Sequence, residues 1–329
     1  MIWKRAWPWF VACLAALAVV PTFGANPYTL HVLSLVGIYA IVAMGLNLVF
    51  GYAGQISLGH AAYFAIGAYT STLVTMHLGL SFVFGMGCAI LVAAALGALV
   101  GIPSLKLEGS YLAMATIGFG EIVKMLLVNA DSVTGGPAGI SRIPPPDVLG
   151  WVLSSPAQRF YLVLVVTAAA FVLYFNLVRS HYGSRFVAVR DSAKAAAAMG
   201  IDVRQTKIHA FVFSTAFAGC AGSLYAHVNR YIAPDAFGLG ESINFLIIVV
   251  VGGMGTLLGP IVGAAIIVYL RETLLALKDY NMLIYGLMLM ILMVFMSRGL
   301  VGTAQVVLRR WRARSAARRE LPVKRSAEG

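Results

Sequence analysis

Charged side chains are scarce in this chain, and acidic ones are the scarcest. Only 11% of the 329 residues are charged, with 12 Asp and Glu against 24 Lys and Arg, whereas 60% are hydrophobic. Mean hydropathy is +0.87. Because soluble domains carry roughly 25% charged residues, this composition excludes that class. It predicts an all-α polytopic transmembrane helical bundle.

Motifs for catalysis and for metal binding are also missing. The sequence has no G-x-x-x-x-G-K-[ST] phosphate loop, no G-x-S-x-G elbow and no His-x-x-x-His pair. Its three cysteines, Cys13, Cys88 and Cys220, lie in separate apolar runs, so we expect buried free thiols and no disulfide. The sequence therefore predicts a protein that is not an enzyme and binds no metal or cofactor.

Apolar runs separated by short polar links divide the chain into about ten membrane segments. We assign eight full spans to residues 7–23, 28–50, 61–76, 82–101, 110–129, 160–178, 210–228 and 282–296, and two half-length segments to 243–251 and 257–270. Lys4 and Arg5 predict a cytoplasmic N-terminus, and the alternation then places the C-terminus in the cytoplasm too. The first run would also suit a signal peptide, but residues 22–25 are a poor cleavage site, which favours a retained helix.

The domain assignment is a transmembrane domain over 1–302 and a basic cytoplasmic tail over 303–329. Eight of the 24 cations lie in the last 21 residues. A net charge of +12 is compatible with nucleic-acid binding. Its clustering beside apolar runs, however, favours contact with anionic lipid, so we expect a lipid bilayer and no nucleic acid as partner.

The longest polar interruption is the segment 179–209, which we call the basic segment. Its six cations are Arg179, Arg185, Arg190, Lys194, Arg204 and Lys207, against only Asp191 and Asp202. This excess predicts a cytoplasmic loop. The alanine-rich run 192–199 follows the possible N-cap Asp191 and stops at Gly200, which predicts a short helix of about two turns. The segment is either a loop that only orients the protein or a docking helix for a cytoplasmic partner.

Two glycine-rich interruptions fall inside apolar surroundings. Residues 51–60 carry three glycines and four polar side chains, and residues 252–256 read Gly-Gly-Met-Gly-Thr. Irregular backbone at membrane depth is tolerated only where protein or water covers it. The two regions share a design and a predicted direction, which indicates a parallel repeat around a translocation path, with chance similarity as the alternative. The path residues predicted are Asn47, Gly51, Gly54, Gln55, Ser57, Gly59, Gly252, Gly253 and Gly255.

Glu121 and Lys124 are the only acid and base that we place well inside a span. Buried charges of this kind are costly and are functional candidates for that reason. Their i, i+3 spacing favours an ion pair within the membrane. The alternative is a proton relay through Glu121, although a relay usually needs a chain of titratable groups.

Several stretches together resemble the branched-chain amino acid permease family over residues 33–302. They are 45–64 (GLNLVFGYAGQISLGHAAYF), 109–116 (GSYLAMAT), 134–140 (TGGPAGI), 179–226 and 251–260 (VGGMGTLLGP). The SYL stretch at 110–112 and the TGG stretch at 134–136 resemble the larger of the two paired permease subunits of this family.

This resemblance implies an inner-membrane subunit of a bacterial ATP-binding cassette importer for branched-chain amino acids. The implied partners are a second, related permease, two cytoplasmic ATPase subunits that use ATP, and a periplasmic amino-acid-binding protein. The implied ATPase-coupling residues are Arg190, Asp191, Lys194, Ala195, Ala196 and Gly200. The family generally has glutamates where Ala193 and Ala197 stand here. This departure argues against an acidic contact with the ATPases and leaves docking by shape. An importer of urea, amides or sugars, an ion-coupled secondary transporter and a non-transporting scaffold remain open.

Overall fold

The computed structural model describes residues 26–104, 109–148, 150–275, 286 and 290. The predicted first span, nearly all of the predicted last span, Lys106, Glu108 and the basic tail lie outside the described residues.

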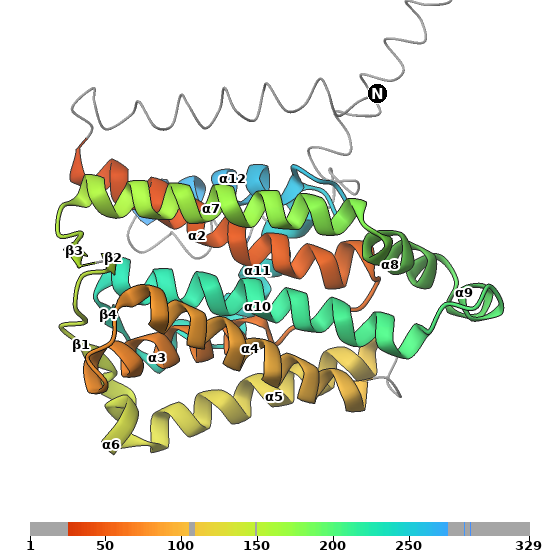
Figure 1. Ribbon diagram of the computed structural model, residues 1–329, viewed down its shortest axis with the longest axis horizontal. Coiled ribbons are helices and arrows are strands. Elements are labelled where there is room, and N and C mark those ends of the chain that lie inside the picture. Colours follow the sequence, from red (N-terminus) through yellow and green to blue (C-terminus); the bar gives the residue numbers. More distant parts are fainter. Residues whose placement is uncertain (1–25, 105–108, 149, 276–285, 287–289, 291–329) are drawn as a thin grey trace, which may run out of the picture.

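Long helices run side by side along the molecule and form an apolar bundle (Figure 1). They are α2 (Pro27–Asn47), α3 (His60–His77), α4 (Phe82–Ser104), α5 (Ser110–Asn129), α7 (Pro156–Arg179) and α10 (Val203–Asn229). Within the described residues, five helical segments are long and apolar enough to cross a membrane: Pro27–Tyr52, Phe82–Ile102, Ser110–Asn129, Pro156–Arg179 and Val203–Asn229. The predicted multi-pass helical class is confirmed.

Helix α10 lies at the centre of the bundle and packs against α2, α3 and α4. Glycines allow this close approach, because a Cβ at Gly67 would overlap the backbone of Gly219, and a Cβ at Gly222 would overlap the carbonyl of Phe64. Small residues are how membrane helices approach closely when no hydrophobic effect drives their association. The small-residue face that the sequence shows around Gly219 and Gly222 is thus the central packing surface.

Buried polar side chains also join α3 to α10. His60 lies 3.0 Å from the Ser57 hydroxyl through Nδ1 and 2.6 Å from the Ser214 hydroxyl through Nε2. Nearer the other end of the same pair of helices, Ser71 lies 3.1 Å from His227 Nε2. These bonds satisfy polar groups that would otherwise be unpaired in an apolar interior, and they fix the register of the two helices.

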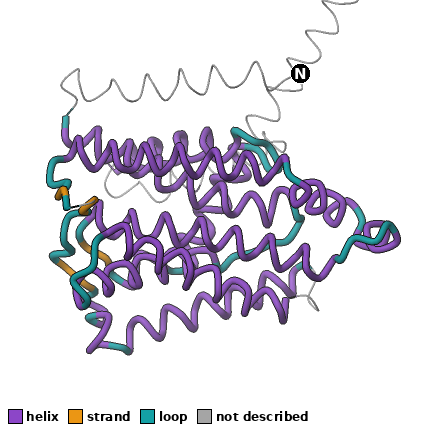
Figure 2. The backbone as a smooth tube through the Cα atoms, viewed as in Figure 1, coloured by secondary structure: helices purple, strands orange, loops and turns teal. Residues whose placement is uncertain are grey.

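The two ends of the bundle differ in structure (Figures 1 and 2). One end, which we call the β end, holds α6 (Asp131–Thr134), η3 (Gly136–Ala138), β1 (Ile140–Ser141), β2 (Asp147–Val148), β3 (Trp151–Val152), β4 (Tyr231–Ile232) and η4 (Pro234–Phe237). Strand β1 pairs antiparallel with β4, with Ile140 opposite Ile232, and β2 pairs with β3. At the other end, which we call the basic end, α8 (His181–Asp191) and α9 (Ala193–Ala198) project from the bundle.

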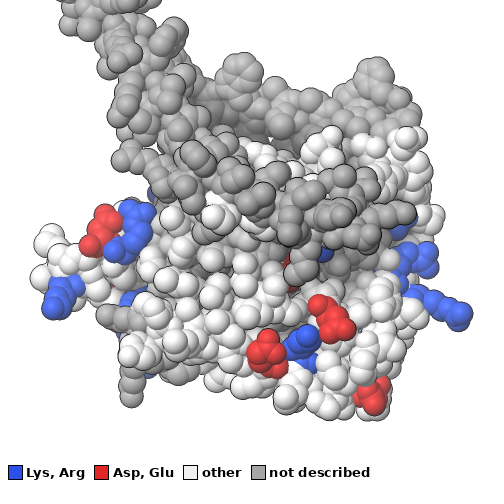
Figure 3. Space-filling model, turned by 180° about the vertical axis from the view of Figure 1, so that it is seen from behind, with Lys and Arg blue, Asp and Glu red and all other residues white. Residues whose placement is uncertain are grey.

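Charged side chains follow this division. The six cations of the basic segment belong to the last residue of α7, to α8 and α9, or to the first turns of α10. Figure 3 shows, on one face, a broad uncharged area between the charges at the basic end and those toward the β end. An apolar band between two charged ends is the surface expected of a bilayer-spanning protein.

The basic segment contains two helices where the sequence predicted one. The predicted helix 192–199 is confirmed as α9, and Gly200 follows it with a positive φ of +81°. The predicted N-cap was wrong: Asp191 is the last residue of α8, and the Ser192 hydroxyl accepts the hydrogen bond from Ala195 N at 3.2 Å. Ser192 takes this role because its backbone is extended (φ −162°, ψ 107°), the conformation of an N-cap.

The two described cysteines, Cys88 and Cys220, are free thiols, as expected. They are half-buried rather than fully buried.

Candidate functional site

The first glycine-rich interruption begins with a change of helix type. Helix α2 ends at Asn47 and continues as a π-helical turn, η2 (Leu48–Tyr52), after which residues 53–59 are irregular until α3 begins. Gly54 has a positive φ of +68°, which glycine adopts without strain. Gln55 is 5% exposed and Ser57 is fully buried, so protein covers this irregular backbone, as predicted. π-Helical turns often occur at functional sites.

The second interruption separates two half-length helices, as the sequence predicted. Helix α11 (Leu239–Gly252) and helix α12 (Gly259–Leu275) are joined by residues 253–258. Gly253 and Gly255 have φ values of +119° and +65°. A Cβ at Gly252 would overlap the backbone of Gly259, so the two helices meet at glycines that leave no room for a side chain.

A single buried side chain, Asn47, joins the two interruptions. Its Oδ1 accepts a hydrogen bond from Gly255 N at 2.9 Å, and its Nδ2 donates to the Thr256 carbonyl at 3.0 Å and to the Tyr174 hydroxyl at 2.7 Å. Asn47 is fully buried. It therefore satisfies backbone groups that the broken helix leaves without intrahelical partners, which irregular backbone at membrane depth requires.

Arg190 brings the basic segment to the same place. From the end of α8, its Nη1 donates to the Gly51 carbonyl at 2.9 Å. The same side chain lies against the second interruption, since a Cβ at Gly255 would be 3.3 Å from Arg190 Nη1, and a Cβ at Gly54 would be 2.7 Å from Arg190 Cγ. Its Nε and Nη2 donate to Asp191 Oδ1 at 3.1 and 2.9 Å, which orients the guanidinium group.

We call this cluster the junction; it comprises Asn47, Gly51, Gly54, Tyr174, Arg190, Asp191, Gly255 and Thr256. It connects a projecting helix pair to the two places where the membrane helices are broken. Arg190 thus connects α8, through a charge-assisted hydrogen bond, to backbone that is not part of a regular α-helix.

Apart from Gln55, which is buried in the first interruption, the predicted path and coupling residues divide into three groups. Six of them meet at the junction: Asn47, Gly51, Gly54, Gly255, Arg190 and Asp191. Four others lie beside the junction. Ser57 forms a hydrogen bond with His60, and Gly59 packs against the Thr116 carbonyl. Gly252 and Gly253 lie where α11 ends at the second break. Lys194, Ala195, Ala196 and Gly200 lie on or beside α9, away from the junction.

Sequence reasoning missed Tyr174 and Thr256. Tyr174 is fully buried in α7, and its ring packs edge-on against Tyr52 at 6.4 Å between centroids. A tyrosine inside the apolar run 160–178 was the available signal, because a buried hydroxyl there needs a polar partner. Thr256 was included in the glycine-rich stretch only as a neighbour, and its carbonyl is what Asn47 binds.

The predicted ion pair between Glu121 and Lys124 is not formed. Lys124 Nζ lies 3.3 Å from Asp235 Oδ1 in η4, and no ion pair joins Glu121 to Lys124 among the described side chains. The long lysine side chain reaches toward the β end, where the polar surface lies, whereas Glu121 is on the outward face of α5.

The outward face of α5 is largely uncovered by the rest of the protein. Only 11% of its apolar window is buried in the protein. The exposed residues recur every three or four positions: Tyr111, Met114, Ala115, Gly118, Glu121, Ile122, Met125 and Leu126. Within this stripe Gly118 has open space in front of it, and Glu121 is charged. We call this stripe the α5 face.

Interrupted helices that meet inside an apolar bundle are a design of membrane transport proteins. The family described as "Branched-chain amino acid transport system / permease component" matches residues 28–295, and the chain belongs to this family. The resemblance seen in the sequence is confirmed. Membership indicates a transport role in a membrane rather than an enzymatic one.

Among curated relatives, the chain is 37% identical to the high-affinity branched-chain amino acid transport system permease protein LivM of Escherichia coli, over 89% of this chain and 74% of that protein. It is 25% identical to a probable LivM of Methanocaldococcus jannaschii, over 82% and 92%. The autoinducer 2 import system permease protein LsrC of Enterobacter sp. is 27% identical over 63% and 62%. A solved PsaBC complex from Streptococcus pneumoniae aligns at 14% identity over 85% of this chain and 95% of that one, with a TM-score of 0.46, too distant to carry an argument.

Proposed function

We propose that this chain is a pore-forming permease subunit of an ATP-binding cassette importer that carries branched-chain amino acids across the bacterial inner membrane. The family membership and the 37% identity to LivM support the cargo and the membrane. The observation that carries the mechanism is the hydrogen bond from Arg190 to the Gly51 carbonyl, which joins the cytoplasmic segment to the broken helices.

The orientation in the membrane follows from charge. The basic end faces the cytoplasm, because its six cations obey the positive-inside rule. The β end then faces the periplasm, where it receives cargo from a binding protein. Both chain termini lie in the cytoplasm on this assignment, and the chain has about ten membrane segments.

Two ATPase subunits supply the energy, and ATP binds to them rather than to this chain. They dock on α8 and α9, with Lys194, Ala195, Ala196 and Gly200 on the contacting surface. Closure of the ATPases displaces α8, and Arg190 transmits this displacement to the π-helical turn and the second break. The glycines there absorb the change in backbone geometry, which opens the path alternately to each side.

A second, related permease packs along the α5 face. A carboxylate exposed to lipid at mid-membrane is costly, so Glu121 requires cover from protein or from a water-filled path. The small residues Ala115 and Gly118 allow a neighbouring helix to approach closely at the same place. The α5 face is then the contact surface for the second permease, and the translocation path in this chain passes the junction.

Reconstitution tests this proposal. Proteoliposomes containing both permeases and both ATPases, supplied with the binding protein outside and ATP inside, should accumulate labelled leucine, isoleucine and valine. Omitting ATP or either permease should abolish uptake. Accumulation by this chain alone under a proton gradient would instead establish an ion-coupled carrier. ATP-driven uptake restricted to urea, amides or sugars would refute the cargo.

A further inference from the structure

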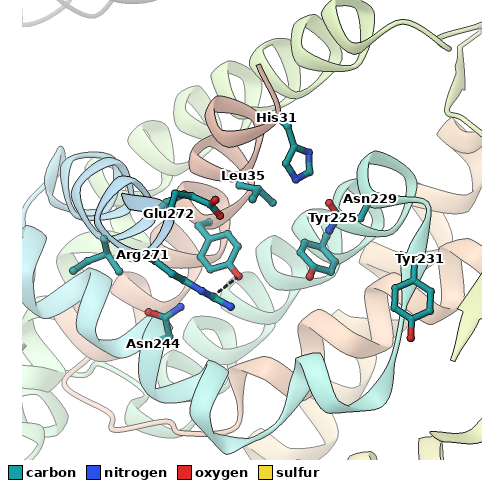
Figure 4. A pocket seen from close by; sticks show the side chains of 11 residues that line it. His31, Leu35, Tyr225, Asn229, Tyr231, Asn244, Arg271 and Glu272 are labelled. Carbon is teal, nitrogen blue, oxygen red and sulfur yellow. Dashed lines mark hydrogen bonds between the residues drawn. The ribbon is translucent and has the colours of Figure 1, made fainter. Parts of the chain in front are cut away.

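A cavity of about 320 Å³ opens at the β end between α2, α10, α11 and α12 (Figure 4). Each helix contributes a side chain from about one turn inside its end: His31, Tyr225, Asn244 and Arg271. One helical turn is about 5.4 Å. With the orientation proposed above, the cavity therefore lies at the periplasmic interface of the membrane. It is on the periplasmic side of the break between α11 and α12.

The cavity presents one cation and one anion that are both held in place. Arg271 Nη1 lies 3.3 Å from the Tyr39 hydroxyl and 3.4 Å from Glu241 Oε2. Glu241, whose side chain is 13% exposed, also accepts a hydrogen bond from the Tyr39 hydroxyl. The next residue, Glu272, accepts a hydrogen bond from the Tyr28 hydroxyl at 2.8 Å. Figure 4 shows Arg271 and Glu272 side by side on α12 at the edge of the cavity.

The rest of the lining combines aromatic and apolar groups. Tyr225 and Tyr231 present aromatic rings. Such rings attract an ammonium group and add to the attraction exerted by a nearby carboxylate. Leu35 adds half-buried apolar surface, and Ile267 and Val268, which are 0% and 4% exposed, lie in the cavity wall behind it. The volume is at the small end of the range for small-molecule sites, roughly 300–1,000 Å³, so the cavity suits a compact amphiphile.

We propose that this cavity binds a primary ammonium group that lies beside an anionic oxygen group, as in an amino-acid zwitterion or an ethanolamine phospholipid. The anionic oxygens face Arg271 and the ammonium faces Glu272. The apolar part lies against Leu35, Ile267 and Val268. For an amino acid, the cavity is a receiving site between release from the binding protein and passage through the junction, and this role rests on the proposed function.

The test uses the assembled importer without binding protein, in nanodiscs of phosphatidylcholine and phosphatidylglycerol, which lack a primary ammonium. Binding of labelled leucine is measured by scintillation proximity. Saturable binding is expected, weakened about tenfold or more by Glu272→Gln, because a charge-assisted hydrogen bond is lost. Asp235→Asn is the matched control, since it removes the same charge from the same end of the bundle, and it should bind leucine normally.

Ligand analogues test the chemistry without altering the fold. 4-Methylpentanoate lacks the ammonium and isoamylamine lacks the carboxylate, so neither should displace leucine at concentrations where isoleucine does. Equal displacement by either analogue would overturn the zwitterion assignment.

A second arm separates the two sources of the ligand. Nanodiscs containing phosphatidylethanolamine should compete with leucine if both use the cavity. Native mass spectrometry that finds this lipid retained by the wild type and lost from Glu272→Gln, with no leucine binding, would assign the same chemistry to lipid. If neither ligand binds, or if Glu272→Gln changes nothing, the proposal fails.

Failure of the receiving site can be distinguished from failure of the proposed function. ATP-driven leucine uptake with an empty cavity would refute only the receiving site. Ligand binding without any uptake would refute only the importer.

Discussion

Arg190 of α8 donates a hydrogen bond to the carbonyl of Gly51, 139 positions earlier in the chain, at 2.9 Å. This contact links a helix outside the apolar bundle to the π-helical turn that ends α2. π-Helical turns are rare and often occur at functional sites, which makes this contact a candidate for the coupling proposed above. It defines a route from the proposed ATPase surface to the path.

Removal of the Arg190 side chain should uncouple the importer. We expect Arg190→Ala to lower ATP-driven leucine uptake about tenfold or more, because a charge-assisted hydrogen bond of about 1.5–3 kcal/mol is lost. Arg190→Lys should give an intermediate loss, since an ammonium cannot hold Asp191 and Gly51 with a planar fork. Uptake is measured in proteoliposomes, corrected for the fraction of importer inserted inside out, and normalised to permease abundance.

Arg185→Ala is the control for the Arg190 variants, because it removes a cation from an exposed position on the same helix. It should retain uptake within about twofold, as surface charges contribute little individually. Equal losses for both variants would indicate that only the charge of the basic segment matters, and the transmitting role of Arg190 would be wrong.

Asn47 should be essential for stability as well as for transport. Asn47→Ala removes the partner of Gly255 N and leaves the Thr256 carbonyl with the longer bond from the Tyr174 hydroxyl, at 3.4 Å. We expect a loss on the order of 2–4 kcal/mol in the free energy of unfolding, seen as a lower Tm in detergent and lower membrane abundance. Asn129→Ala is the control, since Asn129 bonds only the Met125 carbonyl and is exposed. An unchanged Tm for Asn47→Ala would show that water replaces the carboxamide.

Two glycines should respond in opposite ways to the same substitution. Gly222→Ala puts a methyl group into the Phe64 carbonyl and 2.8 Å from Ala68 N, so α3 and α10 must separate. Overpacking of this kind costs about 1–3 kcal/mol. Gly87→Ala meets nothing within 4 Å and should leave Tm unchanged or raise it slightly. Thermal unfolding of the two purified variants decides, and similar Tm values would contradict the tight packing.

The α5 face can be tested for the second permease. Gly118→Leu fills open space on this chain, so its fold and abundance should be unchanged, whereas a helix packed on the stripe would be displaced. We expect co-purification of the second permease to fall several-fold. Gly87→Leu makes the same change at another open position, on α4, and should preserve the complex. Full retention of the second permease by Gly118→Leu would move the interface elsewhere.

The sequence predicted the helices and the breaks because both depend on local chemistry. Apolar runs of about 20 residues and glycine clusters mark them without reference to distant contacts. The contact between Arg190 and Gly51 was beyond such reasoning, since it joins distant parts of the chain. Helix α8 was missed, because its charged residues led us to treat the start of the basic segment as part of a cytoplasmic loop.

The wrong ion pair has a similar explanation. Spacing along α5 places Glu121 and Lys124 near one another on the helix surface. A flexible lysine side chain can, however, pair with any carboxylate within its reach. Asp235 arrives from η4, more than 100 positions later, and competes successfully. Helical spacing specifies which residues are neighbours, and tertiary structure decides which of them bind.

One buried carboxamide, that of Asn47, fastens both interrupted helices. In the proposed mechanism, a break that rearranged alone would leave donors and acceptors of the other break without this partner. On that mechanism, partly switched forms are penalised and the two breaks move together. The expected consequence is an importer that does not leak while it switches.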